Sequence, residues 1–236
     1  MKTIGLLGGM SWESSLEYYR SINRLVKKRL GGLHSAKCLM YSVDFHEIES
    51  LQRQGLWDEA GRLLGGAARN LQKGGADFLL ICTNTMHKVA PVVQRQVRIP
   101  LLHIADPTAK SVLSQGIRKI GLIGTRFTMQ EDFDKGKLVR EHGLEVLTPM
   151  DADMDMIHQV IFEELCLGLT EDASRKKFIA VIDRLQSAGA QGVILGCTEI
   201  SLLVKDKDSS IPLFDTTLIH AEAAVDYALG ASFGRV

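Results

Sequence analysis

The sequence predicts an α/β protein of two pseudo-symmetric domains, each a parallel sheet flanked by helices. Short buried apolar runs alternate with segments of helical spacing, which is typical of a parallel sheet covered on both faces. The second half of the chain repeats features of the first half in the same order. No proline-rich linker separates the halves, and we place the domain boundary near residues 104–106.

The repeat is clearest around one threonine and one cysteine. Residues 75–85 read GADFLLICTNT and residues 189–199 read GAQGVILGCTE, so Thr83 falls on Cys197 without a gap. Strands of α/β proteins resemble one another, but the agreement in order and spacing favours a true repeat. Two further pairs support it: residues 2–8 with 118–124, and residues 99–102 with 211–214.

The first half is expected to supply four strands and three helices. Leu16, Tyr19, Ile22 (or Asn23), Val26 and Leu30 recur at helical spacing and predict the first helix. Pairs of glycines end this helix and the next one. The strands are expected at residues 3–8, 38–43, 78–82 and 101–104, and the helices at 16–30, 57–71 and 86–97.

The second half follows the same plan. Asp106-Pro107 begins a helix, since proline is tolerated in the first turn. Thr128-x-x-Glu131 reads as a capping box and predicts a helix to about Glu141. The first domain then covers 1–104 plus about 215–236, and the second covers 105–214. Further strands are expected at 120–123, 144–148, 192–195 and 211–214, and further helices at 152–167, at 171–187, in a short segment after the third strand and from about 217.

Composition excludes several classes of partner. Of 236 residues, 45% are hydrophobic and 24% are charged, and Lys+Arg and Asp+Glu both number 28. A formal charge of zero favours neither nucleic acid nor an anionic membrane surface. No apolar run approaches the roughly 20 residues that span a bilayer. The four cysteines lack metal-site spacing and disulfide density, so reduced thiols and a cytoplasmic location are expected.

Polar groups follow the buried runs, where ligands bind to parallel sheets. As a thiolate, Cys197 would be a nucleophile or a base, and Glu199 either caps the next helical segment or positions a substrate ammonium. After the first strand, residues 8–11 read Gly-Gly-Met-Ser, which forms either a tight turn or an approach for a small anion. Thr125 occupies the equivalent place in the second half and offers a hydroxyl to a carboxylate.

Three motifs together resemble the cofactor-independent aspartate/glutamate racemases. They are Gly-Cys-Thr-Glu at 196–199, Asn-Thr-x-His at 84–87 and Ile-Gly-Leu-Leu-Gly-Gly-Met-Ser at 4–11, and the resemblance spans essentially the whole chain. It is strongest to the amino-acid racemase branch of the Asp/Glu/hydantoin racemase superfamily. The resemblance implies an active site in the cleft between two domains, a small amino acid as substrate, and neither a pyridoxal cofactor nor a metal.

In this family two cysteines act on opposite faces of the substrate Cα. Here the first position is Thr83 rather than cysteine, and Cys82 lies one residue early. A shift of one residue on a strand turns the side chain to the opposite face, so we expect Cys82 in the core and Thr83 towards the substrate. Cys197 is then expected to abstract the α-proton and Thr83 to donate one, which makes one enantiomer the preferred substrate.

The resemblance also implies the groups that bind the substrate. Asn84, Thr85 and Thr198 are expected at its α-carboxylate, and Met10 and Ser11 at the pocket wall. Gln52 is a candidate for the side-chain carboxylate. His87 either polarises the site or caps its helix, and Cys166 stands where relatives place a basic residue.

Two other readings stay open. The superfamily contains decarboxylases with a single protonating cysteine and isomerases of unsaturated diacids, and one cysteine opposite a threonine fits the former. A catalytically degenerate protein that only binds an amino acid is the non-enzymatic alternative. Homodimers are common among such enzymes, but the sequence shows no decisive interface.

Overall fold

The computed structural model describes residues 1–230, so the last six residues of the expected first domain lie outside the described part. The chain divides into two compact units. The first comprises Met1–Ile104 and the chain from His220 onward, and the second comprises Ala105–Ile219. Among the described residues, no helix is both long and apolar enough to span a membrane.

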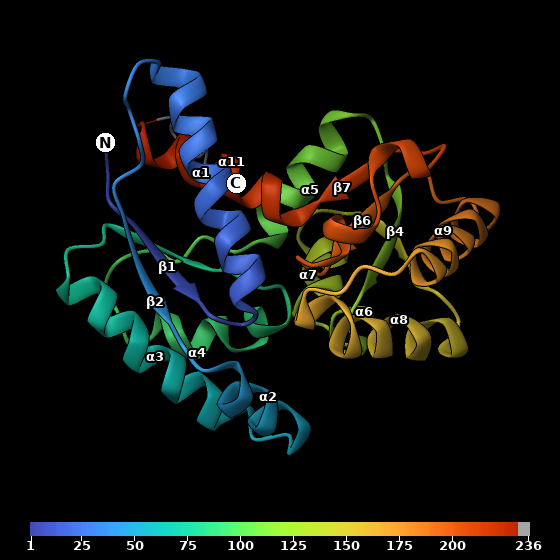
Figure 1. The fold of residues 1–236 in the computed structure, drawn as a ribbon, viewed down its shortest axis with the longest axis horizontal. Coiled ribbons are helices and arrows are strands. Elements are labelled where there is room, and N and C mark those ends of the chain that lie inside the picture. Colours follow the sequence, from blue (N-terminus) through green and yellow to red (C-terminus); the bar gives the residue numbers. More distant parts are fainter. Residues whose placement is uncertain (231–236) are drawn as a thin grey trace. The chain divides into compact units, whose positions relative to one another are not determined.

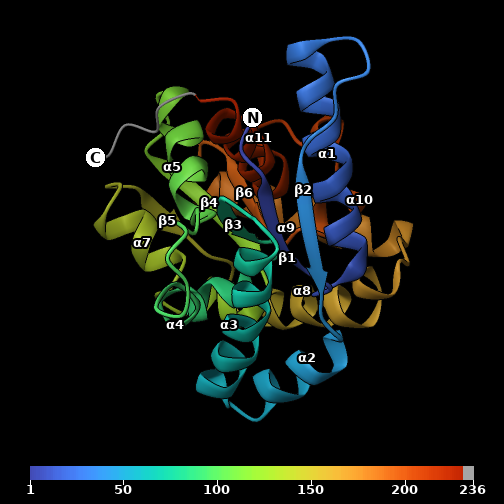
Figure 2. The ribbon, with the colours of Figure 1, turned by 90° about the vertical axis from the view of Figure 1, so that its left-hand side faces the viewer.

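The first unit is built on a parallel sheet. Its strands are β1 (Ile4–Gly8), β2 (Cys38–Ser42) and β3 (Phe78–Ile81), in the order β2-β1-β3. Figures 1 and 2 show β1 and β2 side by side. A single parallel bridge between Leu79 and Leu101 extends the sheet beyond β3.

Helices cover both faces of this sheet because β1 and β3 are buried on both sides. On one face, Ile4, Leu6, Phe78 and Leu80 pack against α1 (Trp12–Leu30) and α11 (Thr216–Ala228). On the other face, Leu7, Leu79 and Ile81 pack against further helices. These are α2 (Phe45–Arg53), α3 (Trp57–Lys73), the 3-10 helix η1 (Thr85–Val89) and α4 (Ala90–Gln94).

The second unit has a parallel sheet of four strands, β4 (Lys119–Gly124), β5 (Glu145–Leu147), β6 (Val193–Gly196) and β7 (Leu213–Asp215). Their order is β5-β4-β6-β7. One face packs against α8 (Asp151–Glu163) and α9 (Asp172–Ser187), and the other against α5 (Ala105–Ser114) and α7 (Lys135–Arg140). The remaining short elements are α6 (Arg126–Gln130), η2 (Leu165–Leu167), α10 (Ile200–Leu203) and η3 (Asp206–Asp208).

The two units share one strand order, which confirms the predicted α/β class of two parallel sheets flanked by helices. In each, the second strand of the unit lies at one edge, the first strand is next to it, and the third strand follows. Leu101 bridges to β3 as β7 pairs with β6, so the repeated segments 99–102 and 211–214 occupy matching places.

Several local predictions are wrong. Residues 45–53 form α2, which the sequence analysis missed, and residues 101–104 form one bridge instead of a strand. Thr128 does not begin a helix, because Thr125 is the N-cap whose hydroxyl accepts the Thr128 amide, and α6 ends at Gln130. A second short helix, α7, follows before Glu141.

The apolar series that predicted α1 is only partly buried. Ile22 and Val26 lie in the core together with Tyr18, whereas Leu16 and Tyr19 remain 42% and 48% exposed. The helix has two apolar stripes, and the periodicity of the sequence alone does not distinguish the one that packs on the sheet.

Candidate active site

Thr83 directly follows the strand β3, and the alternation of that strand fixes its direction. Phe78, Leu80 and Cys82 share one face and lie in the core beneath α1 and α11. Cys82 is fully buried, and burial raises the pKa of its thiol. The expected core position of Cys82 is therefore confirmed. Thr83, one residue later, is half-buried.

The backbone around Thr83 is held by hydrogen bonds on both sides. The Cys82 amide donates to the Leu7 carbonyl at 2.9 Å, and the Ser14 hydroxyl donates to the Cys82 carbonyl at 3.2 Å. Nδ1 of His87 lies 2.9 Å from the Thr83 carbonyl oxygen. These bonds leave little freedom for the peptide groups that flank Thr83.

The loop after β1 uses its glycines for close packing. Gly9 has φ +92°, and a Cβ there would lie 2.3 Å from the Val43 carbonyl oxygen. Its amide donates to the Ser15 hydroxyl at 2.7 Å. Of the two interpretations of this loop, the tight turn is therefore correct for Gly9, since its amide already has a partner within the fold.

The other candidate residues of the first unit are buried close to these loops. Met10 packs in the core cluster with Leu7, and Ser11 is the N-cap of α1, where its hydroxyl accepts the Ser14 amide. Gln52 lies on α2, and its Nε2 is 2.9 Å from Sδ of Met86. Asn84 and Thr85 are buried in the turn after Thr83.

In the second unit, Thr125 and Cys197 follow strand ends that pair with each other. Gly124 of β4 lies opposite Gly196 of β6, so the next residue of each strand opens at the same edge of the sheet. Thr125 is buried, and its Oγ1 caps α6 and lies 3.2 Å from Oγ1 of Thr128.

Cys197 and Glu199 form a buried pair. Sγ of Cys197 donates to Oε2 of Glu199 at 3.0 Å, and the Thr198 hydroxyl donates to the same oxygen at 2.7 Å. Cys197 is 7% exposed and Glu199 is 2% exposed. Glu199 makes no side-chain cap to α10, which rules out the capping alternative for its carboxylate.

The electrostatics of this pair keep the thiol protonated. Burial raises the pKa of Cys197 well above its usual value, and the Glu199 carboxylate and Cys166 raise it further. A thiol that donates to a carboxylate has a proton acceptor within reach. Loss of its proton therefore requires either transfer to Glu199 or the arrival of a positive charge.

A histidine cluster lies beside Thr83, in which His87 and His220 are buried and His103 is half-buried. The His87 ring centroid is 4.6 Å from that of His103 and 5.8 Å from that of His220. Nδ1 of His220 is 2.9 Å from the Tyr18 hydroxyl, and its Nε2 is 3.0 Å from the Leu102 carbonyl. Burial, with His87 nearby, lowers the pKa of His220 to about 3. Its partners lie far apart in the sequence, so spacing gives no signal for this cluster.

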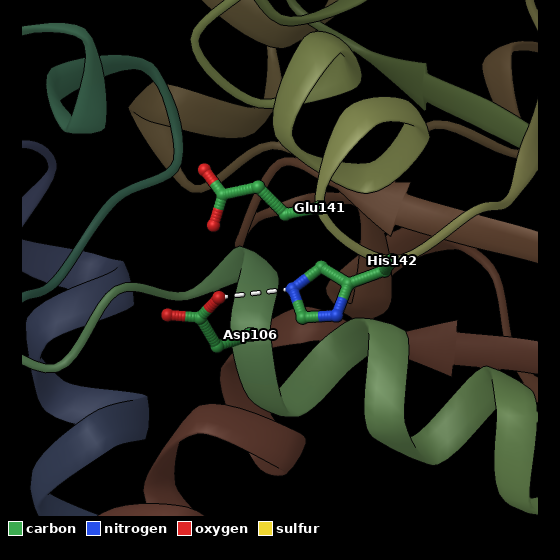
Figure 3. A group of neighbouring side chains, drawn as sticks. All are labelled: Asp106, Glu141 and His142. Carbon is green, nitrogen blue, oxygen red and sulfur yellow. Dashed lines mark hydrogen bonds and ion pairs between the residues drawn. The ribbon is translucent and has the colours of Figure 1, made fainter. Parts of the chain in front are cut away.

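The second unit contains a separate group of side chains that could ligate a metal. Ligand atoms of Asp106, Glu141 and His142 lie within 4.8 Å of one another (Figure 3). The Lys137 ammonium lies 3.0 Å from Oδ1 of Asp106 and 2.5 Å from Oε2 of Glu141. Both carboxylates raise the pKa of Lys137 against the effect of its burial. The lysine supplies the positive charge, so ion pairs suffice to explain the group.

Comparison with known proteins identifies relatives along nearly the whole chain. Residues 7–224 match the sequence model of the Asp/Glu/Hydantoin racemase family. The broad specificity amino-acid racemase RacX of Bacillus subtilis is 24% identical over 230 residues, covering 94% of this chain and 96% of the relative.

Solved structures give the same relationship. A Yersinia pestis protein described as a proposed Asp/Glu racemase is 56% identical, with a TM-score of 0.90 over 97% of this chain and 100% of its own. An aspartate racemase homologue from Pyrococcus horikoshii OT3 is 34% identical, with a TM-score of 0.83 over 97% and 100%. The glutamate racemase of Francisella tularensis, at 14% identity and a TM-score of 0.64, shares the fold over 100% of this chain and 84% of its own.

Proposed function

Because the chain belongs to the Asp/Glu/hydantoin racemase family, whose named relatives are isomerases, we propose that it is a cofactor-independent amino-acid racemase acting on aspartate or glutamate. One observation carries the proposal: the buried Cys197 thiol donates to the buried Glu199 carboxylate at the end of β6. Thr83 holds the equivalent place after β3. The names of the relatives support the substrate class.

The proposed reaction moves one proton off Cα and another onto its opposite face. In this proposal Cys197 acts on one face of the substrate Cα and Thr83 acts on the opposite face. The substrate ammonium favours the Cys197 thiolate, whose proton passes to Glu199. The thiolate takes the α-proton, so the Cα–H bond breaks and an S–H bond forms. The Thr83 hydroxyl donates its proton to the other face and takes one from water, and Glu199 returns its proton to water.

The remaining candidates bind the substrate in this proposal. Asn84 and Thr85 follow Thr83, and Thr198 follows Cys197, so their donors suit an α-carboxylate that gains charge as the proton leaves. Thr125 contributes from the end of β4. Gln52 reaches the side-chain carboxylate after leaving Met86, while Met10 and Ser11 form the wall at the end of β1.

The threonine makes the two directions unequal in rate. A hydroxyl is a far poorer base than a thiolate, but it can still donate a proton to a carbanion. The enantiomer whose α-proton faces Cys197 is therefore the faster substrate, while the equilibrium between free enantiomers stays at unity. Thr83→Cys is expected to raise the rate with the slow enantiomer, and lower rates with both would contradict the asymmetry.

The test is proton NMR of L-Asp, D-Asp, L-Glu and D-Glu with the protein in D₂O. Loss of the α-proton signal without CO₂ release supports a racemase, and Cys197→Ala should abolish the exchange in both directions. Cys82→Ala is the matched control, because this fully buried thiol should be dispensable for turnover. Absence of exchange with all four amino acids would refute the proposed substrates.

A decarboxylase is the second candidate, since a single cysteine faces a non-cysteine at the repeated position. It predicts CO₂ release, which a racemase does not produce. A protein that only binds the amino acid predicts neither CO₂ nor α-proton exchange. The same NMR experiment therefore separates all three.

We also propose a homodimer. Trp12, Leu16 and Tyr19 form an exposed apolar stripe on α1, and Trp12 is 65% exposed. The same helix has an acidic first turn and a basic last turn, so two copies packed antiparallel would bring opposite charges together. Light scattering should give twice the chain mass for the wild type. The double variant Leu16→Ser, Tyr19→Ser should give a lower mass, because the stripe that joins the two copies is weakened. A monomer at micromolar concentration would refute this assembly.

A cytoplasmic location completes the proposal. Cys38, Cys82, Cys166 and Cys197 are all free thiols, which fits a reducing compartment. The test is fractionation of cells that express the protein, and recovery with the secreted fraction would contradict it.

A further inference from the structure

Both ring nitrogens of His87 are engaged with the backbone, which fixes its tautomer. The Ile104 amide donates to Nε2 at 3.2 Å, so Nε2 carries no proton. Nδ1 therefore carries the proton and donates it to the Thr83 carbonyl at 2.9 Å. The neutral ring links two backbone groups, one beside the proposed proton donor and one at Ile104.

The Thr83 carbonyl belongs to the peptide group that follows this residue. The preceding peptide group is fixed by Ser14, whose hydroxyl donates to the Cys82 carbonyl. With both peptide groups bound, the Cα–Cβ direction of Thr83 is set by Ser14 on one side and His87 on the other. Without His87, the second peptide group could rotate and carry the hydroxyl with it.

The other end of the His87 link is equally well held. Ile104 is the last residue of the first unit before the chain enters the second. Two residues earlier, the Leu102 carbonyl accepts from Nε2–H of His220, which is the first residue after the chain returns. Nδ1 of His220 then accepts from the Tyr18 hydroxyl. The segment to which His87 ties Thr83 is thus anchored to both α1 and α11.

We propose that His87 is a positioning residue for Thr83, which holds the hydroxyl in line for proton delivery through the Nδ1–H bond to the Thr83 carbonyl. This inference rests on the proposed function. A displacement of about 1 Å in a reacting group can lower a rate by about 10²-fold, so the loss of this bond is expected to affect inversion strongly. His87 itself touches no reacting atom and exchanges no proton with the substrate.

Two substitutions separate the two bonds of the ring. In His87→Asn the amide nitrogen replaces Nδ1 and keeps the donor to Thr83, while the acceptor for Ile104 is lost. In His87→Gln the longer side chain places its amide oxygen near Nε2 and keeps the acceptor for Ile104, while the donor to Thr83 is lost. Each variant loses one bond, so a purely structural role predicts similar effects from both.

The informative readout is the ratio of inversion to α-deuterium incorporation in D₂O. Cys197 alone can remove the α-proton, exchange with solvent and return a deuteron to the same face, whereas inversion requires Thr83. Chiral chromatography measures inversion, and mass spectrometry measures deuterium. His87→Gln is expected to lower the ratio about 10-fold or more with KM little changed, and His87→Asn to keep it within about twofold.

His103→Gln is the control, because the His103 ring packs against the ring of His87. It should leave the ratio unchanged. Equal ratios in the asparagine and glutamine variants, at matched folded fractions, would overturn the positioning role while wild-type exchange still supports a racemase. No exchange by the wild-type protein would instead overturn the proposed function itself.

Discussion

Replacement of Glu199 by glutamine should accelerate the alkylation of Cys197 but slow the turnover of the enzyme. The Glu199 carboxylate raises the pKa of the Cys197 thiol, second only to burial. The substitution removes the charge and keeps the shape and the acceptor oxygen. The thiolate becomes easier to form, so alkylation of Cys197 should accelerate. Turnover should fall, because the group that receives the thiol proton is lost.

The size of the first effect follows from the separation of the two groups. Sγ of Cys197 and Oε2 of Glu199 are 3.0 Å apart. Two unit charges at 4 Å repel by about 1 kcal/mol in water and by about 4 kcal/mol at an effective dielectric constant of about 20. Even the lower energy corresponds to about a fivefold larger thiolate population. Loss of a general base typically lowers turnover by about 10²-fold or more.

Iodoacetamide labelling at pH 7.5 followed by peptide mass spectrometry measures the rate at Cys197 separately from the other cysteines. Turnover of the same preparation is measured by α-proton exchange in D₂O, and thermal unfolding verifies that the variant is folded. Slower labelling, or turnover within twofold of the wild type, would refute the assigned role of Glu199.

Three further predictions concern stability and the register of the site. The folded pKa of His220 of about 3 lies below its unfolded value, so its contribution is complete above about pH 6.5 and is lost towards pH 3, by about 1.4 kcal/mol per pH unit. In His220→Gln the free energy of urea unfolding should depend less on pH between pH 7 and 4. The same slope against pH as in the wild type would exclude this contribution of His220. Gly9→Ala should lower the free energy of urea unfolding by at least about 2 kcal/mol, because its Cβ would clash with Val43. Gly116→Ala is the control and should cost about 1 kcal/mol, because Gly116 has φ +74° but open space around it. Equal losses in the two variants would refute the clash. Cys82→Ala should lower stability by about 1 kcal/mol in the same assay and leave α-proton exchange intact, and loss of exchange would refute its core assignment.

The predictions based on strand alternation and the internal repeat were the accurate ones. Every strand of the two main sheets was expected within a few residues, because runs such as Phe78–Ile81 are buried on both faces and read as continuous apolar segments. The core position of Cys82 followed from the alternation of side chains between the two faces of a strand, which the backbone geometry enforces.

Predictions that depended on competing local signals were less accurate. Both Thr125 and Thr128 are suitable N-caps, and the structure uses Thr125. The helix α2 was missed because its N-cap, Asp44, follows β2 after a single residue and the helix is short. The links among His87, His220 and Tyr18 join distant segments, and a single sequence contains no information on such pairs.

Because α11 lies at the end of the chain but packs on the first sheet, the first unit can be completed only after the second unit has been synthesised. The second unit is one unbroken stretch, so all its strands and helices have left the ribosome before the chain returns to the first unit at His220. The first sheet is made earlier, but Ile4, Leu6, Phe78 and Leu80 lack part of their cover until α11 emerges. A chain that stops before α11 therefore leaves this apolar face open to aggregation and to chaperones, although every strand of the two described sheets is already present.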